Sequence, residues 1–408
     1  MNRLPVLDPD RLTAVDLTAP AVHAEHDLSA VWRRLRADHP LYWHPPMGGH
    51  PGFWVLTRHA DVSAVFRDGN RFTSTHGNVL ETLLAGGDSA TGKMLAVTDG
   101  PRHLAVRRII TGALTVEVLD RMAERIEVHV RDLVKRALER DDCDFGRDVA
   151  AELPLATICD MLAVPDADRP YIHQLGSSSV SSHAAEHTTA DAWTSKNEIL
   201  AYFLELADER RLAPGEDMVS LLANATVRGR PLGDDEIVFN CYSLILGGDE
   251  TTRLAMTGAV LALAEHPAQW RALRQGDVSI DAAVEEILRW TNPSRHLGRT
   301  ATEPVEMAGG RIEEGDIVTV WIASANFDER EFAGPDDLQL DRTPNRHLTF
   351  AYGPHFCLGA RLGRIQLAAT LRALRDQVAS IEVTGAPAHV YSNFLGGVCN
   401  LPVLLKGC

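Results

Sequence analysis

The segment from Asp234 to about Glu265 has the longest helical periodicity in the chain, and it limits the folds that the chain can adopt. At 1.5 Å per residue, a continuous helix here would be about 48 Å long, which is the width of a whole domain. Apolar residues precede and follow a polar island, "GGDETT", at residues 247–252.

The polar island interrupts this helix with residues that are unfavourable in a helix interior. Gly247 and Gly248 each cost about 1 kcal/mol relative to alanine there, and Asp249, Glu250 and two threonines follow them. One interpretation is a chance break between two shorter helices. The other is that the glycines let a large group approach the backbone, and that the acid and the hydroxyls handle protons beside it.

The rest of the chain predicts a mainly α protein with a minor β portion. Helical periodicity dominates from about residue 101 to 290, whereas residues 299–325 and the late segment "NLPVLLK" have the alternation and the β-branched residues of strands. Residues 174–197, rich in Ser, Thr, Ala and His, are expected to form a mobile surface connection between helices. Because no repeat or linker divides the sequence, we expect a single domain over residues 1–408.

Charge and hydropathy exclude several classes of protein. The formal net charge of -16 argues against general nucleic-acid binding, which needs a basic surface. No apolar run approaches the roughly 18 to 20 residues of a membrane-spanning helix, and the start "MNRLPVLDPDRL" lacks the apolar core of a secretory signal. We therefore expect a soluble, cytoplasmic protein with no membrane partner, and a monomer.

The loop "FAYGPHFCLG", residues 350–359, places Cys357 directly before the helical segment "ARLGRIQLAATLRALRDQV". The positive end of the helix dipole and the free amides of a first turn lower the pKa of a thiol and favour the thiolate. Such a thiolate could be a nucleophile, a zinc ligand or an axial iron ligand. No second cysteine or histidine stands at zinc-ligand spacing, and His355 is poorly placed as a base because it lies on the same loop.

The neighbours of Cys357 favour the third possibility. The loop has an apolar wall that includes Phe350, and it has flexible positions at Gly353 and Gly359. These residues suit a sulfur that is shielded from water beneath a flat cofactor. Haem–thiolate ligation therefore fits best.

Charged residues form two further motifs on predicted helices. Glu286 and Arg289 are spaced i, i+3 in "AVEEILRW", a pair that is also common on exposed helices. In "DGPRHLAVRRII", His103 and Arg107 are spaced i, i+4 and form either a solvated surface or a cationic clamp for carboxylates or phosphates. In addition, a thin line of arginines follows the helix after the cysteine loop, and it is either a solvated face or a docking site for an acidic partner.

Taken in chain order, these motifs resemble the cytochrome P450 family. The pattern F-x-x-G-x-x-x-C-x-G at residues 350–359 is similar to the haem-binding loop of that family, and "GGDETT" and Glu286-x-x-Arg289 occupy the family's places. The resemblance extends from "FWVLTRHADVSAVF" to "NLPVLL" and is greatest to the soluble bacterial enzymes. It implies the cytochrome P450 fold, with a long central helix over haem b (iron protoporphyrin IX).

The resemblance implies roles for individual residues. Cys357 would be the metal ligand, and Glu250 and Thr251 would be the acid–alcohol pair that guides protons to dioxygen, with space left by Gly247 and Gly248. The cofactor-binding loop would include Phe350, Gly353 and Gly359. Four basic side chains match positions that bind the haem propionates: His103, Arg107, Arg299 and His355. A structural ion-pair network would join Glu286, Arg289 and Arg342.

The substrate and the redox partner follow less directly. In "WTNPSRHLGRT", Ser294, Arg295 and His296 stand where relatives often have apolar pocket residues, which leads us to expect a polar or anionic substrate, or one presented on a carrier protein. Ser243 and Leu246 of the long helix are expected to line the same pocket. A ferredoxin would dock on a basic face that contains Arg102, Arg108, Arg361 and Arg364.

The activity that the resemblance implies is that of a haem–thiolate monooxygenase. Electrons from NAD(P)H would arrive through a reductase and ferredoxin, and one atom of dioxygen would enter a C–H bond or a double bond. Natural-product biosynthesis is the expected context, with β-hydroxylation of a carrier-bound amino acid as one alternative. The same fold could instead catalyse oxidative coupling, dehydration or a peroxide-driven reaction. A haem sensor or carrier without turnover is the alternative from another class.

Overall fold

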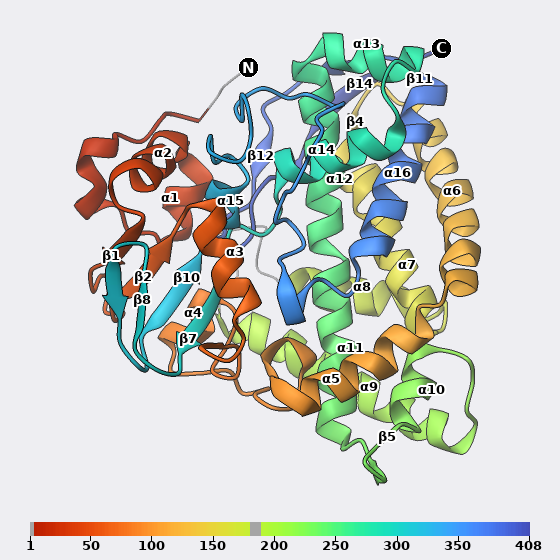
Figure 1. The fold of residues 1–408 in the computed structure, drawn as a ribbon. Helices are drawn as coiled ribbons and strands as arrows, with labels where there is room; N and C mark the ends of the chain where they lie inside the picture. The colour runs from red at the N-terminus through yellow and green to blue at the C-terminus, as the bar shows by residue number, and fades with distance from the viewer. Residues whose placement is uncertain (1–3, 180–188) are drawn as a thin grey trace.

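The structure is a computed structural model that describes residues 4–179 and 189–408. One side of the molecule is built on a small twisted sheet, and the other is built of helices (Figure 1). This division confirms the predicted mainly α fold with a minor β portion. No helix among the described residues is long and apolar enough to span a membrane.

The sheet side combines the beginning of the chain with residues 297–325. Its five strands have the order β1-β2-β10-β7-β3, in which only the β10–β2 pair is parallel. The later strands come from the segment whose alternation predicts strands. The elements of this side are η1 (Pro9–Ala14), α1 (Pro20–Glu25), α2 (Ser29–Asp38), β1 (Leu41–His44), β2 (Phe53–Leu56), α3 (His59–Arg67), β3 (Phe72–Thr73), α4 (Leu80–Leu84), β7 (Leu297–Ala301), β8 (Val305–Met307), β9 (Gly310–Ile312), β10 (Ile317–Val320) and α15 (Ile322–Ala325).

The helical side contains most of the remaining chain. The predicted connection at 174–197 coincides in part with α8 and α9, while residues 180–188 lie outside the described residues. The elements of this side are η2 (Leu95–Val97), α5 (Gly100–Ala113), α6 (Val116–Leu138), η3 (Gly146–Ala150), α7 (Glu152–Leu162), α8 (Arg169–Ser179), α9 (Thr189–Leu212), α10 (Met218–Ala223), α11 (Asp234–Gly248), α12 (Glu250–Glu265), α13 (Pro267–Gln275), α14 (Ile280–Thr291), η4 (Gly353–His355) and α16 (Ala360–Gln377).

Short strands complete the helical side. Strand β14 lies between β11 and β4, and it contains most of the segment "NLPVLLK". The remaining strands form two-stranded ribbons. The bounds are β4 (Cys143–Asp144), β5 (Thr226–Val227), β6 (Arg230–Pro231), β11 (Val378–Val383), β12 (Ala388–His389), β13 (Val398–Asn400) and β14 (Pro402–Gly407).

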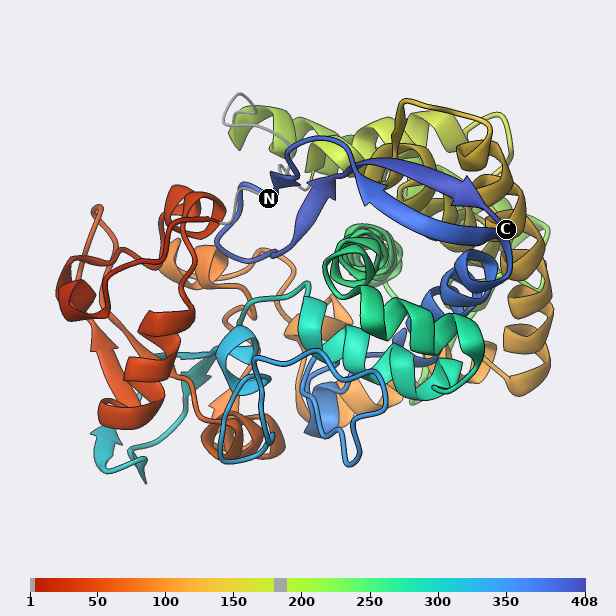
Figure 2. The same cartoon turned by 90° about the horizontal axis from the view of Figure 1, so that it is seen from above.

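The central segment begins and ends where the sequence predicts, but it is two helices. Acidic residues in the first turn of α11 favour its start, where the Glu236 carboxylate also accepts a hydrogen bond from the Gly233 amide at 3.0 Å. The helix ends at Gly248, and α12 resumes after the single residue Asp249, whose φ and ψ are −85° and −77°. Seen from above, α12 stands end-on in the middle of the helical side (Figure 2).

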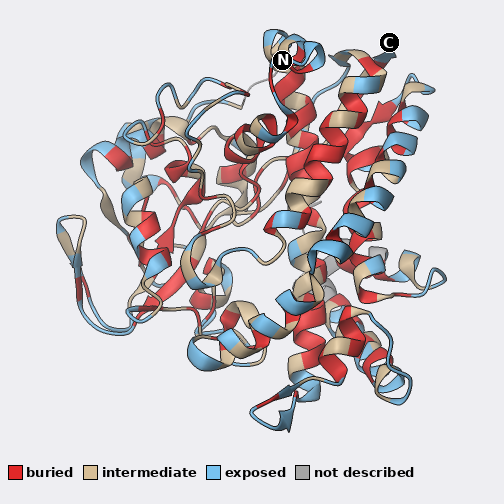
Figure 3. Cartoon of the chain, turned by 45° about the vertical axis from the view of Figure 1, so that its right-hand side comes forward, coloured by how far each residue is buried: buried red, intermediate tan, exposed pale blue. Residues whose placement is uncertain are grey.

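Burial explains why α12 occupies this place. Apolar residues surround it on several sides, and Met256, Ala259, Val260 and Leu263 are among those that are buried. In Figure 3 much of the ribbon of the central helices is accordingly red, the colour of buried residues. The outer helices alternate between buried and exposed residues. The break at Asp249 therefore lies inside the protein, next to the loop that carries Cys357.

Candidate active site

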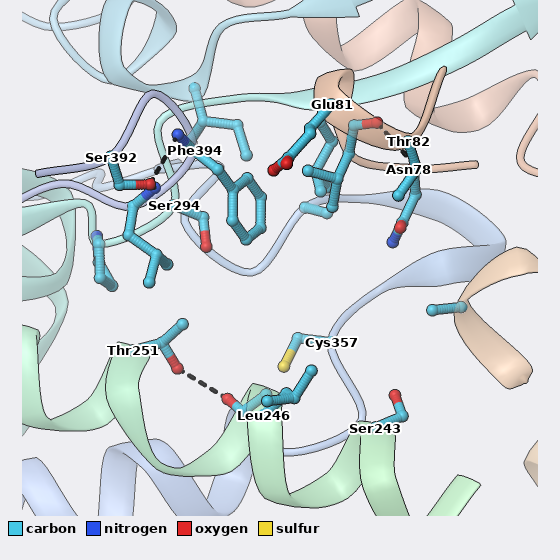
Figure 4. A pocket seen from close by; sticks show the side chains of 18 of the residues that line it. Asn78, Glu81, Thr82, Ser243, Leu246, Thr251, Ser294, Cys357, Ser392 and Phe394 are labelled. Carbon is cyan, nitrogen blue, oxygen red and sulfur yellow. Dashed lines mark hydrogen bonds between the residues drawn. The ribbon is translucent and has the colours of Figure 1, made fainter. Parts of the chain in front are cut away.

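Two adjoining cavities, of about 870 Å³ and about 270 Å³, lie between the central helix and the Cys357 loop. The residues that line both cavities include Ser243, Gly247, Thr251, Phe350 and Cys357. The close view shows Cys357 and Thr251 pointing into the same space from the loop and from α12 (Figure 4). The larger volume is in the range that buries a small organic molecule.

The backbone of the cysteine loop is held in a narrow turn. The Cys357 amide donates to the Phe350 carbonyl at 2.9 Å. Gly353 has a φ of +73°, and a Cβ atom there would lie 2.3 Å from the carbonyl oxygen of Phe66. Only glycine fits this position. At Gly359, by contrast, the nearest atom to an added Cβ would be the Cys357 sulfur at 4.0 Å, so the loop leaves room around the sulfur.

The electrostatic surroundings of Cys357 differ from those that the sequence predicts. Burial raises the pKa of the Cys357 thiol, although the Gly359 amide and the guanidinium groups of Arg107 and Arg364 act in the opposite direction. The sulfur is accessible from the cavity, but the cavity itself lies inside the protein. The helix end alone therefore does not produce a thiolate here. A coordinated metal ion deprotonates a thiol directly.

Four basic side chains gather at the smaller cavity. Burial, His355 and Arg107 lower the pKa of His103 to about 4, and the Nε2 atom of His103 is buried without a hydrogen-bond partner. Burial lowers the pKa of Arg299 only to about 10, so this guanidinium stays charged at neutral pH. The four side chains that line the cavity are those that the sequence predicts: His103, Arg107, Arg299 and His355.

A residue that sequence reasoning missed orients this group. The Asp99 carboxylate lies 2.7 Å from Nε2 of His355 and accepts hydrogen bonds from the Thr73 hydroxyl and the Ser74 amide. Burial alone would raise the pKa of Asp99, but these hydrogen bonds outweigh burial and lower it to about 2. The His355 ring then packs on His103 at 4.3 Å between centroids. An aspartate directly before "GPRH" is the signal that could have revealed it.

These observations test whether the site fits haem. A sulfur faces a cavity beside the central helix, and an orphaned imidazole nitrogen and two guanidinium groups border the same cavity. Thiolate ligation and anionic propionates need this combination of groups. The residues present therefore fit haem.

Comparison with known proteins decides the family. A family model described as cytochrome P450 matches residues 279–374. The chain is 49% identical over 407 residues to cytochrome P450 NovI of Streptomyces niveus, with 100% of both chains covered. The chain belongs to the cytochrome P450 family. It is thus an oxidoreductase of the monooxygenase class, in a family whose members bind haem.

Solved structures of other cytochromes P450 have the same fold. P450 OxyD, described as involved in the biosynthesis of vancomycin-type antibiotics, has a TM-score of 0.88 and 34% identity, with 97% of this chain and 100% of that chain covered. P450BioI, solved in complex with an acyl carrier protein ligated to hexadec-9Z-enoic acid, has a TM-score of 0.82 and 26% identity, with 93% and 98% covered.

The central helix of this cytochrome P450 separates residues that the sequence places together. Thr251 lines both cavities, and its hydroxyl donates to the Gly247 carbonyl at 2.7 Å across the helix break. Glu250 lines neither cavity, and its buried carboxylate forms a 3.1 Å ion pair with Arg253. The predicted acid–alcohol pair is therefore divided, because successive residues of a helix point about 100° apart and Glu250 faces Arg253 whereas Thr251 faces the cavities.

A side chain at Gly247 and a side chain at Gly248 would have different surroundings. A Cβ at Gly247 would meet nothing within 4 Å, as expected for a residue that leaves space in the cavity. A Cβ at Gly248 would lie 2.4 Å from the Ile158 side chain of α7. The backbone of Gly248 borders the smaller cavity, but its missing side chain allows α7 to approach. That Gly248 also leaves space for dioxygen stays a prediction.

The predicted ion-pair contacts are present in this cytochrome P450. Glu286 and Arg289 are both fully buried and are joined at 2.8 Å, and Arg342 donates to the same carboxylate at 3.0 Å. The Gln339 amide and the Asn345 side chain donate to it as well, each at 3.0 Å. The carboxylate thus ties the segment that precedes the cysteine loop to α14.

Only some of the predicted substrate residues line a cavity. Ser243, Leu246 and Ser294 line the larger cavity. Arg295 and His296 do not line either cavity, which corrects their prediction as pocket residues. The Arg295 guanidinium donates to the carbonyls of Leu395 at 2.8 Å and His23 at 3.1 Å, and the His296 ring packs 4.6 Å from that of Trp321. In the extended segment just before β7, successive side chains point to opposite sides, which turns Arg295 away from Ser294.

Arg295 is thus expected to contribute to stability instead of substrate binding. Replacing Arg295 with leucine leaves two buried carbonyls without donors, which should reduce the stability by about 2 kcal/mol. The affinity in substrate-induced spectral titrations should stay unchanged. Ser294→Ala is the matched control, because it should alter binding and leave the unfolding midpoint in place. A weaker titration with an unchanged midpoint in the Arg295 variant would contradict this reassignment.

The predicted basic face is less basic than the sequence indicates. Arg102, Arg361 and Arg364 each have an acidic partner, so three of the four predicted charges are partly compensated within the chain. Arg108 is exposed and forms no ion pair with a described residue. The partners are Glu236 for Arg102, Asp120 at 3.7 Å for Arg361, and Glu285 at 2.6 Å for Arg364.

Proposed function

We propose that this cytochrome P450 inserts one oxygen atom from dioxygen into a C–H bond or a double bond of an organic substrate during the biosynthesis of an antibiotic or a related natural product. The observation that carries the proposal is the cavity of about 870 Å³ that has the Cys357 sulfur and the Thr251 hydroxyl on its wall. The similarity to P450 OxyD, which is involved in the biosynthesis of vancomycin-type antibiotics, supports the biosynthetic context.

Different residues of the chain have different roles in the proposed reaction. Cys357 would hold the iron, and the basic group of His103, Arg107, Arg299 and His355 would hold the propionates. Haem, when it is bound, supplies the redox chemistry that splits dioxygen. Thr251 lines both cavities and donates its hydroxyl proton to the Gly247 carbonyl, so the lone pairs of its oxygen remain available to accept a hydrogen bond during proton transfer.

Electrons come from NAD(P)H through a ferredoxin reductase and a ferredoxin. The exposed Arg108 and the weakly paired Arg361 remain as contacts for an acidic ferredoxin, since Arg361 lies 3.7 Å from its partner and both are exposed. Docking on this face brings the partner close to the Cys357 loop, because α16, which carries Arg361, begins directly after that loop.

A substrate presented on a carrier protein is the second candidate. The likeness to P450BioI, whose solved complex contains an acyl carrier protein, favours it. Binding of the isolated substrate and of the carrier-linked substrate can be compared by the same spectral titration.

The test is reconstitution with ferredoxin, ferredoxin reductase and NADPH, followed by product analysis after turnover in isotopically labelled dioxygen. One labelled oxygen atom per product molecule is the expected result. A product without label would indicate coupling, dehydration or peroxide chemistry, and the lack of any substrate-dependent NADPH consumption would indicate a sensor or a carrier.

Thr251→Val is expected to reduce the product formed per NADPH by roughly 10- to 100-fold, because proton delivery loses its hydroxyl. Oxygen consumption should continue, so the measurement is the amount of product formed per oxygen molecule consumed. Thr257→Val is the control. Its hydroxyl makes the same kind of bond, to the Arg253 carbonyl at 2.9 Å, but it lies outside both cavities. An unchanged yield in the Thr251 variant would contradict the role.

A further inference from the structure

One wall of the larger cavity is formed by α4 and the 391–395 loop, and it has polar side chains that make no hydrogen bond or ion pair with a described residue. Asn78, Glu81 and Ser294 line the cavity, and none of their side chains makes a hydrogen bond or an ion pair with a described residue. Figure 4 shows the Glu81 carboxylate and the Phe394 ring pointing into the cavity from these two segments. In that view they lie on the side of the cavity opposite Cys357 and Thr251. Glu81 is exposed, and Asn78 and Ser294 are half-buried, so a ligand in the cavity can reach all three side chains.

Glu81 is the charged group of this wall that remains available. Asp88 also lines the cavity, but its carboxylate accepts a hydrogen bond from the Ala90 amide at 2.9 Å. Lys196 lies over the Phe239 ring at 5.5 Å and donates to a serine hydroxyl, and no ion pair joins it to Glu81. An uncompensated carboxylate beside an aromatic ring favours a cation.

We propose that Glu81 selects a substrate that carries an ammonium group. The carboxylate forms the ion pair, the Phe394 ring adds a cation–π contact, and Asn78 supplies a further hydrogen-bonding group. The ammonium end then lies at the α4 wall, and the rest of the molecule extends toward Cys357 and Thr251. This inference rests on the proposed function and names the substrate class. It replaces the anionic substrate expected from the sequence, since Arg295 lies outside the cavity.

The experiment uses three esters that differ only at nitrogen: phenylalanine methyl ester, its N-acetyl derivative and methyl 3-phenylpropionate. Affinities come from the shift of the haem absorption band, and equilibrium dialysis gives them independently of the spectrum. We expect the ammonium ester to bind about tenfold more tightly than either neutral ester, which corresponds to about 1.4 kcal/mol. Glu81→Gln, which keeps the shape and removes the charge, should abolish the difference.

The matched control is Glu314→Gln, which removes an equal charge from an exposed turn outside the cavity. The preference should persist in this variant. Equal affinities for the three esters, failure of the ammonium ester to bind, an unchanged preference in Glu81→Gln, or an equal loss in both variants would each overturn the inference.

The failure of this inference can be distinguished from that of the proposed function. The carbon monoxide spectrum of the reduced protein and ferredoxin-driven oxygen consumption are measured on the unsubstituted protein, and they report on haem ligation and electron transfer instead of on the preference for an ammonium group. If both are normal while the esters bind alike, the monooxygenase proposal stands and only the substrate class is wrong.

Discussion

Replacing Cys357 with serine is expected to abolish monooxygenase activity and the thiolate-type absorption band of the reduced, carbon monoxide-treated protein. The Cys357 sulfur faces the cavity, where it meets the haem iron in the proposed complex. A serine hydroxyl keeps the size of the side chain but is a much poorer ligand for iron than a thiolate. The measurement is the difference spectrum, together with product formation in the reconstituted system.

The fold should survive this substitution. The Cys357 amide, and not its sulfur, makes the 2.9 Å hydrogen bond to Phe350 that holds the loop. The unfolding midpoint of the haem-free protein should therefore be unchanged. Cys408→Ser is the matched control, because Cys408 is also an exposed free cysteine but lies at the end of the chain. A Cys357 variant with an intact band would refute the assignment of the ligand.

Replacing Glu286 with glutamine is expected to reduce the stability by about 3–5 kcal/mol, the usual effect of removing one partner of a buried ion pair. The Arg289 guanidinium would stay fully buried without its carboxylate, and Arg342 would lose the same partner. Because the network lies just before the cysteine loop, the variant should also retain less haem. The measurements are the midpoint of urea unfolding and the haem content of the purified protein.

The neighbouring residue provides the control. Glu285→Gln makes the same chemical change one position earlier, but the Glu285 side chain is 32% exposed and pairs with Arg364 near the surface. Its loss should be about 1 kcal/mol or less. Similar losses in the two variants would show that the effect is a general property of α14, and that burial of Glu286 is not its cause.

The sequence alone determined the features that depend on residues close together in the chain. The spacing of Phe350, Gly353 and Cys357 predicts the cavity-facing cysteine loop, because a turn and a following helix begin from these few residues. The i, i+3 spacing of Glu286 and Arg289 predicts their contact for the same reason. Helical and strand periodicities likewise predict the central helices and the strands of residues 297–320.

Only the tertiary structure decided which side chains reach the cavity. Ser294 and Arg295 are adjacent, yet one lines the cavity and the other donates to carbonyls of distant segments. Glu250 and Thr251 are adjacent on α12, yet Glu250 pairs with Arg253 and Thr251 lines the cavity. Glu81 of α4 and Phe394 of the 391–395 loop are 313 residues apart in the chain. Periodicity fixes the neighbours along one element, whereas the direction of a side chain at a bend depends on packing against parts of the chain that no local pattern contains.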